Sequence, residues 1–205
     1  MKKALILGAS GGIGSAVANN LKKQYWDVTS LSRSLNQFDI TNEDSVQASL
    51  SSVRGPFNYI LIATGALEIK STPEKSINHL SKSNMIDHFV TNTIGPALIL
   101  KHIRLLLDKK SSSIVSVLSA RVGSIEDNKL GGWYSYRAAK AAVNQIVKSF
   151  SIELSRSHPK ACLLAIHPGT VDTNLTHKYS SNYPKQTPAE ACLLYTSPSP
   201  RDHQP

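Results

Sequence analysis

The chain has 205 residues, of which 40% are hydrophobic and 18% charged, and its formal net charge at pH 7 is +9. This is ordinary globular composition at a length suited to one well-buried domain, which excludes a largely disordered chain. The basic residues are scattered and are not interleaved with aromatic residues, so the charge predicts no nucleic-acid partner but can attract an anionic cofactor.

Short apolar runs alternate with helical patterns along the chain. Strands are expected at 4–9, 27–33, 57–65, 112–120 and 161–170. Helices are expected at 15–25, at 41–53 with Thr41 as the N-cap, at 86–107 with a kink at Pro96, at 134–154, and at 187–194 with Thr187 as the N-cap. This alternation predicts a single-domain α/β fold, a Rossmann-type doubly wound parallel sheet with helices on both faces.

The sequence carries no sign of export, membrane insertion or a metal site. Lys2 and Lys3 precede an apolar run at 4–7, whereas a signal peptide needs roughly 7–15 apolar residues. No run approaches the roughly 18 apolar residues of a membrane span. Cys162 and Cys192 match no metal or redox spacing and suit a reducing compartment. We therefore expect a cytoplasmic protein with no metal and no membrane partner.

The first expected strand leads into a glycine-rich turn, "GASGGIG" at residues 8–14. Glycines allow the backbone to approach a pyrophosphate, which the N-terminus of the next helix stabilises. The spacing can be read as GxxxGxG with Gly8, Gly12 and Gly14, or as GxxGxxG with Gly11 in place of Gly12. The alternative is a glycine-rich turn without a ligand.

The end of the second expected strand bears on cofactor choice. Folds that bind NAD place a carboxylate there to accept hydrogen bonds from the ribose, but this chain has Ser32, Arg33 and Ser34. Because an arginine can bind a 2′-phosphate, we expect NADP(H) to be favoured over NAD(H). The alternative is that Arg33 is an ordinary loop cation.

The stretch "YSYRAAK" carries the candidate reaction centre. Tyr136 and Lys140 are four residues apart and share a helix face, whereas Tyr134 has Ala138 at that offset. An ammonium beside a phenol lowers its pKa, so Tyr136 is a candidate acid/base for proton transfer to a carbonyl oxygen.

Together these motifs resemble the short-chain dehydrogenase/reductase family, in the group of C-factor and sniffer-like carbonyl reductases. The resemblance covers residues 1–194 and rests on "GASGGIG", "FDIT", "IATGA", "TNTIGP", "SVLSARVGS", "YSYRAAK" and "HPGTVDT". It implies a dinucleotide site formed by Gly8, Ser10, Gly12, Ile13, Gly14, Arg33, Asp39, Ala63, Gly65, Tyr136, Lys140, Pro168, Gly169, Val171 and Thr173. It also implies catalytic roles for Tyr136, Lys140, Ser119 and Asn92, with Asn92 ordering a relay water in an irregular helix. Taken singly, Asn92 could be a satisfied helix amide, Asp39 a turn residue, and Pro168–Gly169 an ordinary turn.

The chain departs from the family pattern at three places. The usual Asn-Asn-Ala-Gly strand end is "IATG", without the asparagine side chains. The family's serine lies three residues before a glycine, a position occupied here by Ala120, so Ser119 is taken as the candidate and Ser124 as the reserve. No final edge strand follows the last helix. Residues 195–205, "YTSPSPRDHQP", resemble a translated adaptor sequence and are predicted to be a non-native or disordered tail.

The leading hypothesis is an NADPH-dependent reductase that transfers a hydride to an aldehyde or ketone. The sequence does not specify an oligomeric state, but the family resemblance implies the helices at 86–107 and 134–154 as the faces of a homodimer. A second hypothesis is a nucleotide-binding signalling protein of the C-factor type with little or no turnover. A third, a sugar-nucleotide epimerase or dehydratase, ranks last because barely thirty residues follow "HPGTVDT".

Overall fold

The structure, a computed structural model, describes residues 1–179 and 184–196 of the chain. Its centre is a five-stranded sheet in the order β2-β1-β3-β4-β5, with every pairing parallel. The strands are β1 (Lys3–Leu7), β2 (Asp27–Leu31), β3 (Tyr59–Ile62), β4 (Ser113–Leu118) and β5 (Ala161–Ile166). The chain runs outward from β1 to β2 and then returns to the other side of β1 for β3. This reversal creates the switch point at which doubly wound folds bind ligands, and the predicted Rossmann-type fold is confirmed.

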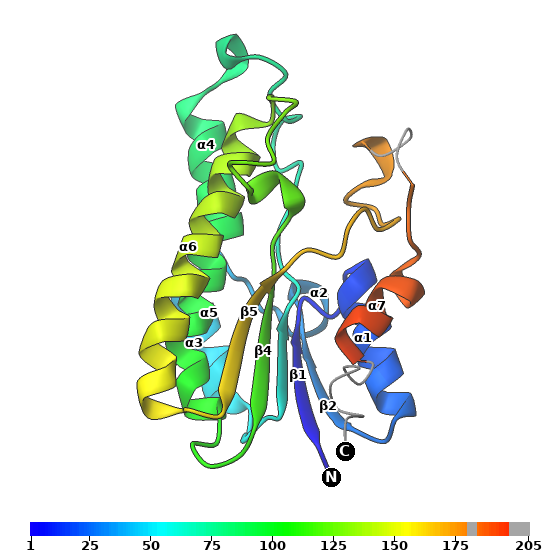
Figure 1. The fold of residues 1–205 in the computed structure, drawn as a ribbon, viewed down its shortest axis with the longest axis vertical. Coiled ribbons are helices and arrows are strands. Elements are labelled where there is room, and N and C mark those ends of the chain that lie inside the picture. Colours follow the sequence, from blue (N-terminus) through cyan, green and yellow to red (C-terminus); the bar gives the residue numbers. More distant parts are fainter. Residues whose placement is uncertain (180–183, 197–205) are drawn as a thin grey trace.

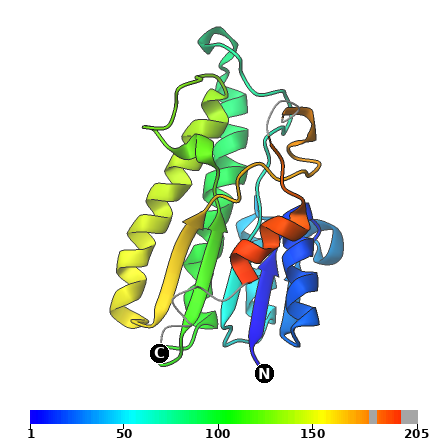
Figure 2. The ribbon, with the colours of Figure 1, turned by 45° about the vertical axis from the view of Figure 1, so that its right-hand side comes forward.

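Helices cover both faces of the sheet (Figure 1). One face carries α1 (Gly12–Lys23) and α7 (Pro188–Thr196), which pack against each other (Figure 2). The other face carries α3 (Glu43–Ser52), α5 (Gly95–Ile103) and α6 (Tyr134–Ser157), and α4 (Lys82–Phe89) lies before α5 in the chain. The short helices are α2 (Arg33–Asn36), η1 (Ile77–His79), η2 (Val90–Ile94), η3 (Arg104–Leu106), η4 (Arg121–Gly123) and η5 (His177–Tyr179). None of the helices described is both long and apolar enough to cross a bilayer.

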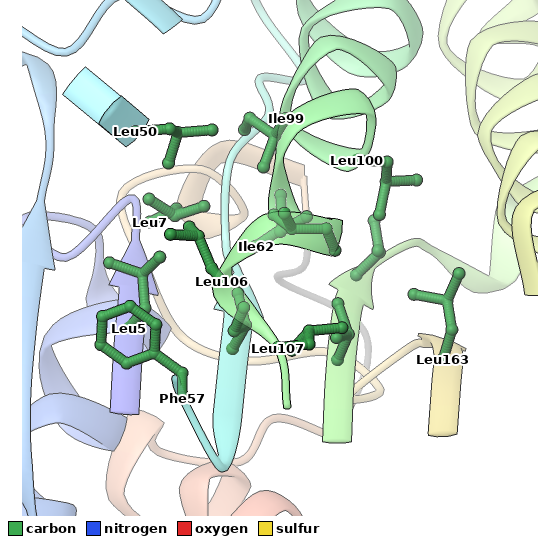
Figure 3. Packing of buried hydrophobic residues seen from close by; sticks show 14 of the residues in the cluster. Leu5, Leu7, Leu50, Phe57, Ile62, Ile99, Leu100, Leu106, Leu107 and Leu163 are labelled. Atoms are coloured by element: carbon green, nitrogen blue, oxygen red, sulfur yellow. The ribbon is translucent and has the colours of Figure 1, made fainter. Parts of the chain in front are cut away.

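The core forms two layers because the central strands are buried on both faces. Leu5 and Leu7 of β1 point toward α3 and α5, where they meet Ile99 and Leu50 in the larger cluster (Figure 3). The alternate residues of β1 pack with α1 and α7 in the smaller cluster, which includes Cys192. Successive strand side chains face opposite sides of a sheet, so the continuous apolar runs that predicted these strands reflect burial from both sides.

The strands end earlier than the sequence predicts. The predicted ranges extend two to four residues past the observed ends at Leu7, Leu31, Ile62, Leu118 and Ile166. At these carboxyl ends the chain leaves the sheet to form the loops of the candidate site, and Ser32 already caps α2 by accepting a hydrogen bond from Leu35 N at 3.3 Å. Arg33 therefore lies in a helical turn and not at the end of a strand.

The prediction that Thr41 is the N-cap of the second long helix is wrong. Asn42 caps α3 because its Oδ1 accepts a hydrogen bond from Ser45 N at 3.1 Å. The Thr41 hydroxyl instead donates to Asp39 Oδ1 at 2.8 Å. Asx turns compete with helix caps for the same kinds of side chain, and here the turn at Asp39 uses the threonine.

The helix expected at 86–107 is broken by a wide turn. It starts earlier, at Lys82, and the π-helical turn η2 separates α4 from α5. In η2 the Gly95 N–H donates to Val90 O, five residues back. The irregularity precedes Pro96, where the kink was predicted, because proline lacks the N–H that would bond the carbonyl four residues earlier, that of Asn92.

The far edge of the sheet is open within the described residues, as predicted. No strand among residues 1–179 and 184–196 pairs with the outer edge of β5. Ile114 of β4 and Leu164 of β5 remain 46% and 42% exposed. The last helix begins as expected, with Thr187 Oγ1 accepting from Glu190 N at 3.2 Å. It continues through Thr196, and residues 197–205, the rest of the predicted tail, lie outside the described residues.

Candidate active site and nucleotide-binding edge

The glycine loop lies at the switch point between β1 and β3. Gly8 N donates to Leu31 O at 2.8 Å and Ala63 N donates to Leu7 O at 2.7 Å, so the loop is held by both neighbouring strands. Gly8 has φ +88°, and a Cβ there would lie 2.4 Å from Ala63 O. The predicted residues Gly8 and Ala63 are therefore in direct contact.

The two readings of the glycine spacing differ in what the backbone requires. A Cβ on Gly14 would lie 2.3 Å from Gly8 O, and one on Gly12 would lie 2.7 Å from Thr173 Cγ2. A Cβ on Gly11 would approach nothing closer than Gly8 O at 3.4 Å, an ordinary contact. The structure thus requires glycine at positions 8, 12 and 14 more strictly than at 11, which favours the GxxxGxG reading.

These residues fit the pyrophosphate of a dinucleotide. Gly11, the N-cap of α1, provides no side-chain hydrogen bond, and the first turn has no acidic residue. Ser10, Gly11 and Gly12 are exposed, and Ile13 is partly buried beside them. A helix N-terminus without side-chain capping leaves backbone N–H groups available to an anion.

The adenosine side of the predicted site is formed by Arg33 and Asp39. Arg33 is exposed at the start of α2, beyond the carboxyl end of β2. Hydrogen bonds from the Thr41 backbone and hydroxyl hold the pKa of Asp39 below its usual value, and Arg33 contributes to this lowering. Asp39 Oδ1 is thus committed to the turn with Thr41.

Asn92 clamps the loop after β3. Its Oδ1 accepts from Ala66 N and its Nδ2 donates to Ala66 O, both at 2.9 Å. This pairing fixes the orientation of the amide, so Nδ2 is also the donor toward His88 Nδ1 at 3.3 Å. His88 is fully buried, and burial lowers the pKa of its imidazole. The neutral ring therefore carries its proton on Nε2, an atom without a hydrogen-bond partner among the described residues.

Tyr136 and Lys140 occupy the buried face of α6. They are 6% and 4% exposed, and Lys140 Nζ lies 5.8 Å from the centroid of the Tyr136 ring. Nζ donates to Leu118 O at 3.0 Å. Burial raises the pKa of Tyr136 to about 12 and lowers that of Lys140 to about 8. The protein groups alone therefore do not lower the pKa of Tyr136 as the sequence predicted, because burial outweighs a lysine directed at a backbone carbonyl.

Gly65 connects the nucleotide edge to this pair. A Cβ on Gly65, which has φ +143°, would lie 2.8 Å from Asn92 Oδ1 and 3.2 Å from Lys140 Nζ. Gly123 is packed as tightly, because its Cβ would lie 2.9 Å from the backbone of Lys140. The structure thus brings Gly65, Asn92, Tyr136 and Lys140 together.

The segment after β5 returns to the glycine loop. Gly169 has φ +76°, Val171 is 2% exposed, and Pro168 O accepts from Gln186 Nε2 at 3.0 Å. The contact between Thr173 and Gly12 places this segment opposite the N-terminus of α1.

Ser119 has surroundings different from those of Tyr136. It extends the ladder by donating its N–H to Ile166 O at 2.7 Å, and its buried Oγ has no hydrogen-bond partner among the described residues. It lines a cavity of about 510 Å³ with Ser124, Asn144, Ala165 and His167. Neither Tyr136 nor Lys140 is among the residues that line this cavity. Ser119 as the group that polarises a carbonyl stays a prediction.

Sequence reasoning missed four residues around Tyr136. The His88 and Trp133 rings meet its ring edge-on, at centroid distances of 5.9 and 6.4 Å, and Tyr179 meets Trp133 at 5.7 Å. Glu74, from the loop before α4, is buried beside the start of α6. His88 lies one helical turn before Asn92, a spacing that could have indicated it, but no local pattern indicates the other three.

Comparison with known proteins agrees with this geometry. The family model described as short chain dehydrogenase matches residues 2–184. A 1-hydroxy-2-glutathionyl-2-methyl-3-butene dehydrogenase from Rhodococcus sp. (strain AD45) is 28% identical over 93% of this chain and 87% of the relative. Benzil reductase from Bacillus subtilis is 24% identical over 85% and 76%, and the C-signal protein of Myxococcus xanthus is 31% identical over 49% and 59%.

Solved structures show the same fold. A short-chain dehydrogenase/reductase from Burkholderia multivorans with bound NADP superposes with a TM-score of 0.73 at 23% identity, covering 92% of this chain and 86% of that one. The family match spans most of the chain, and the glycine-rich loop lies at the switch point of the sheet. The chain therefore belongs to the short-chain dehydrogenase/reductase family of NAD(P)-dependent oxidoreductases.

Proposed function

We propose that the protein is an NADPH-dependent reductase of aldehydes or ketones. One observation carries the proposal: Tyr136 and Lys140 lie one turn apart on the buried face of α6, and Lys140 Nζ lies close to Gly65 and Asn92. A phenol beside a lysine, next to a dinucleotide-binding edge, is suited to carbonyl reduction. The similarity to benzil reductase supports a carbonyl substrate.

A dinucleotide held at the glycine loop and Arg33 would supply the hydride for the carbonyl carbon, and side chains of the protein would supply the proton. Tyr136, with its pKa raised to about 12, stays protonated at neutral pH and donates its phenolic proton to the carbonyl oxygen. Lys140, when protonated, stabilises the phenolate that remains, and Asn92 holds the loop at Ala66. Ser119 is the proposed group that polarises the carbonyl.

The proposed preference for NADPH depends on Arg33. Its exposed guanidinium lies beyond the end of β2, where a carboxylate would repel a 2′-phosphate. The structural neighbour with bound NADP supports this choice of cofactor. A fluorescence titration of the purified chain with NADPH and NADH tests it, and tighter binding of NADH would contradict it.

A second candidate function is nucleotide-dependent signalling with little turnover. It is favoured by Ala120, which occupies the position of the family's serine, and by the similarity to C-signal. For both candidate functions we propose a homodimer that forms through the helical segments at 86–107 and 134–154.

Carbonyl-dependent oxidation of NADPH separates the two functions. Tyr136→Phe removes the phenolic proton, so we expect turnover to fall by about 10²–10⁴-fold with NADPH binding retained. Tyr134→Phe, which alters the neighbouring tyrosine of the same helix, is the matched control and is expected to keep full turnover. Equal activity of both variants would exclude Tyr136 as the acid.

A further inference from the structure

Glu74 is a buried carboxylate that belongs to none of the sequence motifs. It is 3% exposed, in the segment between β3 and α4. Its side chain accepts hydrogen bonds from Asn84 Nδ2 at 2.7 Å, from Ser135 N at 3.3 Å and from the Ser135 hydroxyl. Its main-chain oxygen accepts from Trp133 N at 2.5 Å. Buried carboxylates are rare unless their hydrogen-bonding capacity is used, and here the carboxylate accepts from Asn84 and, twice, from Ser135, the residue before Tyr136.

The start of α6 needs this acceptor. Trp133, the N-cap, has left-handed backbone angles (φ 52°, ψ 41°) and provides no side-chain cap. Gly131 and Gly132 before it also have positive φ. A left-handed conformation is unfavourable for a bulky residue, and the first N–H groups of a helix have no partner within the helix. The main-chain oxygen of Glu74 accepts from the Trp133 N–H, and its carboxylate accepts from the Ser135 N–H, directly before Tyr136.

The same carboxylate joins α6 to α4. Asn84 lies in the first turn of α4, where its N–H donates to the N-cap Ser81 at 3.2 Å. Further along this helical segment, His88 meets the Tyr136 ring and Asn92 clamps the loop at Ala66. Glu74 therefore connects the helix that carries the proposed acid to the helix that leads to the proposed relay residue.

We propose that Glu74 is a positioning residue of the reaction centre, which caps α6 and ties it to α4 so that the Tyr136 phenol is held where the carbonyl oxygen binds. The inference rests on the proposed reductase function. Glu74 acts through Ser135, Trp133 and Asn84, and its hydrogen bonds are directed at these residues and not at the phenol. Small displacements of a catalytic group can cost about a hundredfold in rate, so the expected signature is a loss of kcat without a loss of binding.

Glu74→Gln is the informative substitution because it keeps the size of the side chain. Glutamine has one acceptor oxygen and one NH2 group, so in either orientation its NH2 faces a donor, Ser135 N or Asn84 Nδ2. We expect kcat for carbonyl reduction to fall about tenfold to a hundredfold, with KM for the carbonyl and Kd for NADPH within about twofold. Glu126→Gln, a change at an exposed loop carboxylate, is the matched control and is expected to leave all three unchanged.

A rescue variant distinguishes positioning from general destabilisation. In Glu74→Gln/Asn84→Asp the carboxylate is moved to α4, where it accepts from the NH2 of the introduced glutamine while the glutamine oxygen accepts from Ser135 N. We expect this double variant to recover most of the lost kcat. If Glu74→Gln does not fold, Ser135→Ala, which removes only the hydroxyl donor, is expected to lower kcat by about threefold to tenfold with unchanged KM. An unchanged kcat in Glu74→Gln, or in Ser135→Ala where that variant is used, would overturn the proposal. A parallel loss of kcat and NADPH affinity without rescue would also overturn it.

A second readout does not depend on turnover. In a Trp26→Phe background, Trp133 is the remaining tryptophan and its emission reports on the start of α6. Glu74→Gln is expected to shift this emission to longer wavelength, and Glu126→Gln is not. If the unmodified protein shows no NADPH oxidation with any carbonyl compound, the proposed function fails. The Trp133 emission then decides the inference: a shift in Glu74→Gln supports the role of Glu74 in holding Tyr136, and an unchanged spectrum refutes it.

Discussion

The nucleotide-binding edge and the reaction centre are built in different ways. The edge is a backbone structure in which Gly8, Gly12 and Gly14 permit close approaches to Ala63 O, Thr173 and Gly8 O. The reaction centre is a side-chain structure in which a buried carboxylate, an imidazole and an amide surround Tyr136 and Lys140. The first region therefore excludes a side chain at Gly8 and Gly14, whereas the second depends on which polar groups remain paired.

The largest effect is expected at the glycine loop. Gly14→Ala places a methyl group 2.3 Å from Gly8 O, so we expect a loss of about 3 kcal/mol of unfolding free energy and loss of NADPH binding. Gly11→Ala is the matched control, because its nearest contact is at 3.4 Å, and it is expected to cost less than about 1 kcal/mol. Denaturant unfolding measures both variants. Equal destabilisation would show that the loop is not packed as tightly as the geometry requires.

In the reaction centre, the buried Lys140 is expected to make the free energy of unfolding depend on pH. Lys140 is 4% exposed, and burial lowers its pKa to about 8, while the unfolded chain keeps the ordinary value of about 10.4. Between these values the unfolded state binds more protons than the folded state, so the contribution of Lys140 to stability rises with pH, by up to about 3 kcal/mol.

Comparison with Lys140→Met isolates this contribution. Unfolding free energies at pH 8 and pH 10 are measured for both proteins, and the difference between them is expected to move in favour of the unmodified chain as pH increases. A difference that stays constant with pH would show that Lys140 is not desolvated in the folded state.

Arg33 is a side chain at the nucleotide-binding edge, and its substitution tests how this edge distinguishes NADPH from NADH. Arg33→Ala removes a charged partner of the 2′-phosphate, so Kd for NADPH is expected to rise about tenfold to a hundredfold while Kd for NADH changes little. Arg54→Ala, at another exposed arginine, is the control. If both cofactors weaken equally, Arg33 acts through the fold of α2 and not through the phosphate.

The smallest effect is expected at the serine position. Because Ser119 Oγ lies in a cavity not lined by Tyr136, Ser119→Ala is expected to lower kcat by only about twofold to fivefold, within the range of a single neutral hydrogen bond. Ala120→Ser places a hydroxyl at the family's usual position and is expected to raise kcat. An unchanged kcat in Ser119→Ala would show that the Ser119 hydroxyl does not polarise the carbonyl.

Sequence reasoning succeeded where the signal is local. The alternation of apolar runs with helical patterns, the glycines after β1 and the i, i+4 spacing of Tyr136 and Lys140 each lie within a few residues of chain. It failed at boundaries and caps. The N-cap of α3 is Asn42 and not Thr41, because the Thr41 hydroxyl donates a hydrogen bond to Asp39 in the preceding turn. The break before α5 is a π-helical turn that lies before Pro96.

Periodicity and spacing in the sequence were sufficient to predict the doubly wound fold, the glycine-rich turn after β1 and the shared helix face of Tyr136 and Lys140, because they encode which faces are buried. Only the tertiary structure decided the chemistry around that pair. Contacts across sixty-one residues bring Glu74 to Ser135, and burial sets the pKa of Tyr136 and Lys140 in directions that spacing did not predict. Desolvation depends on every element packed around a group, so no local pattern contains it.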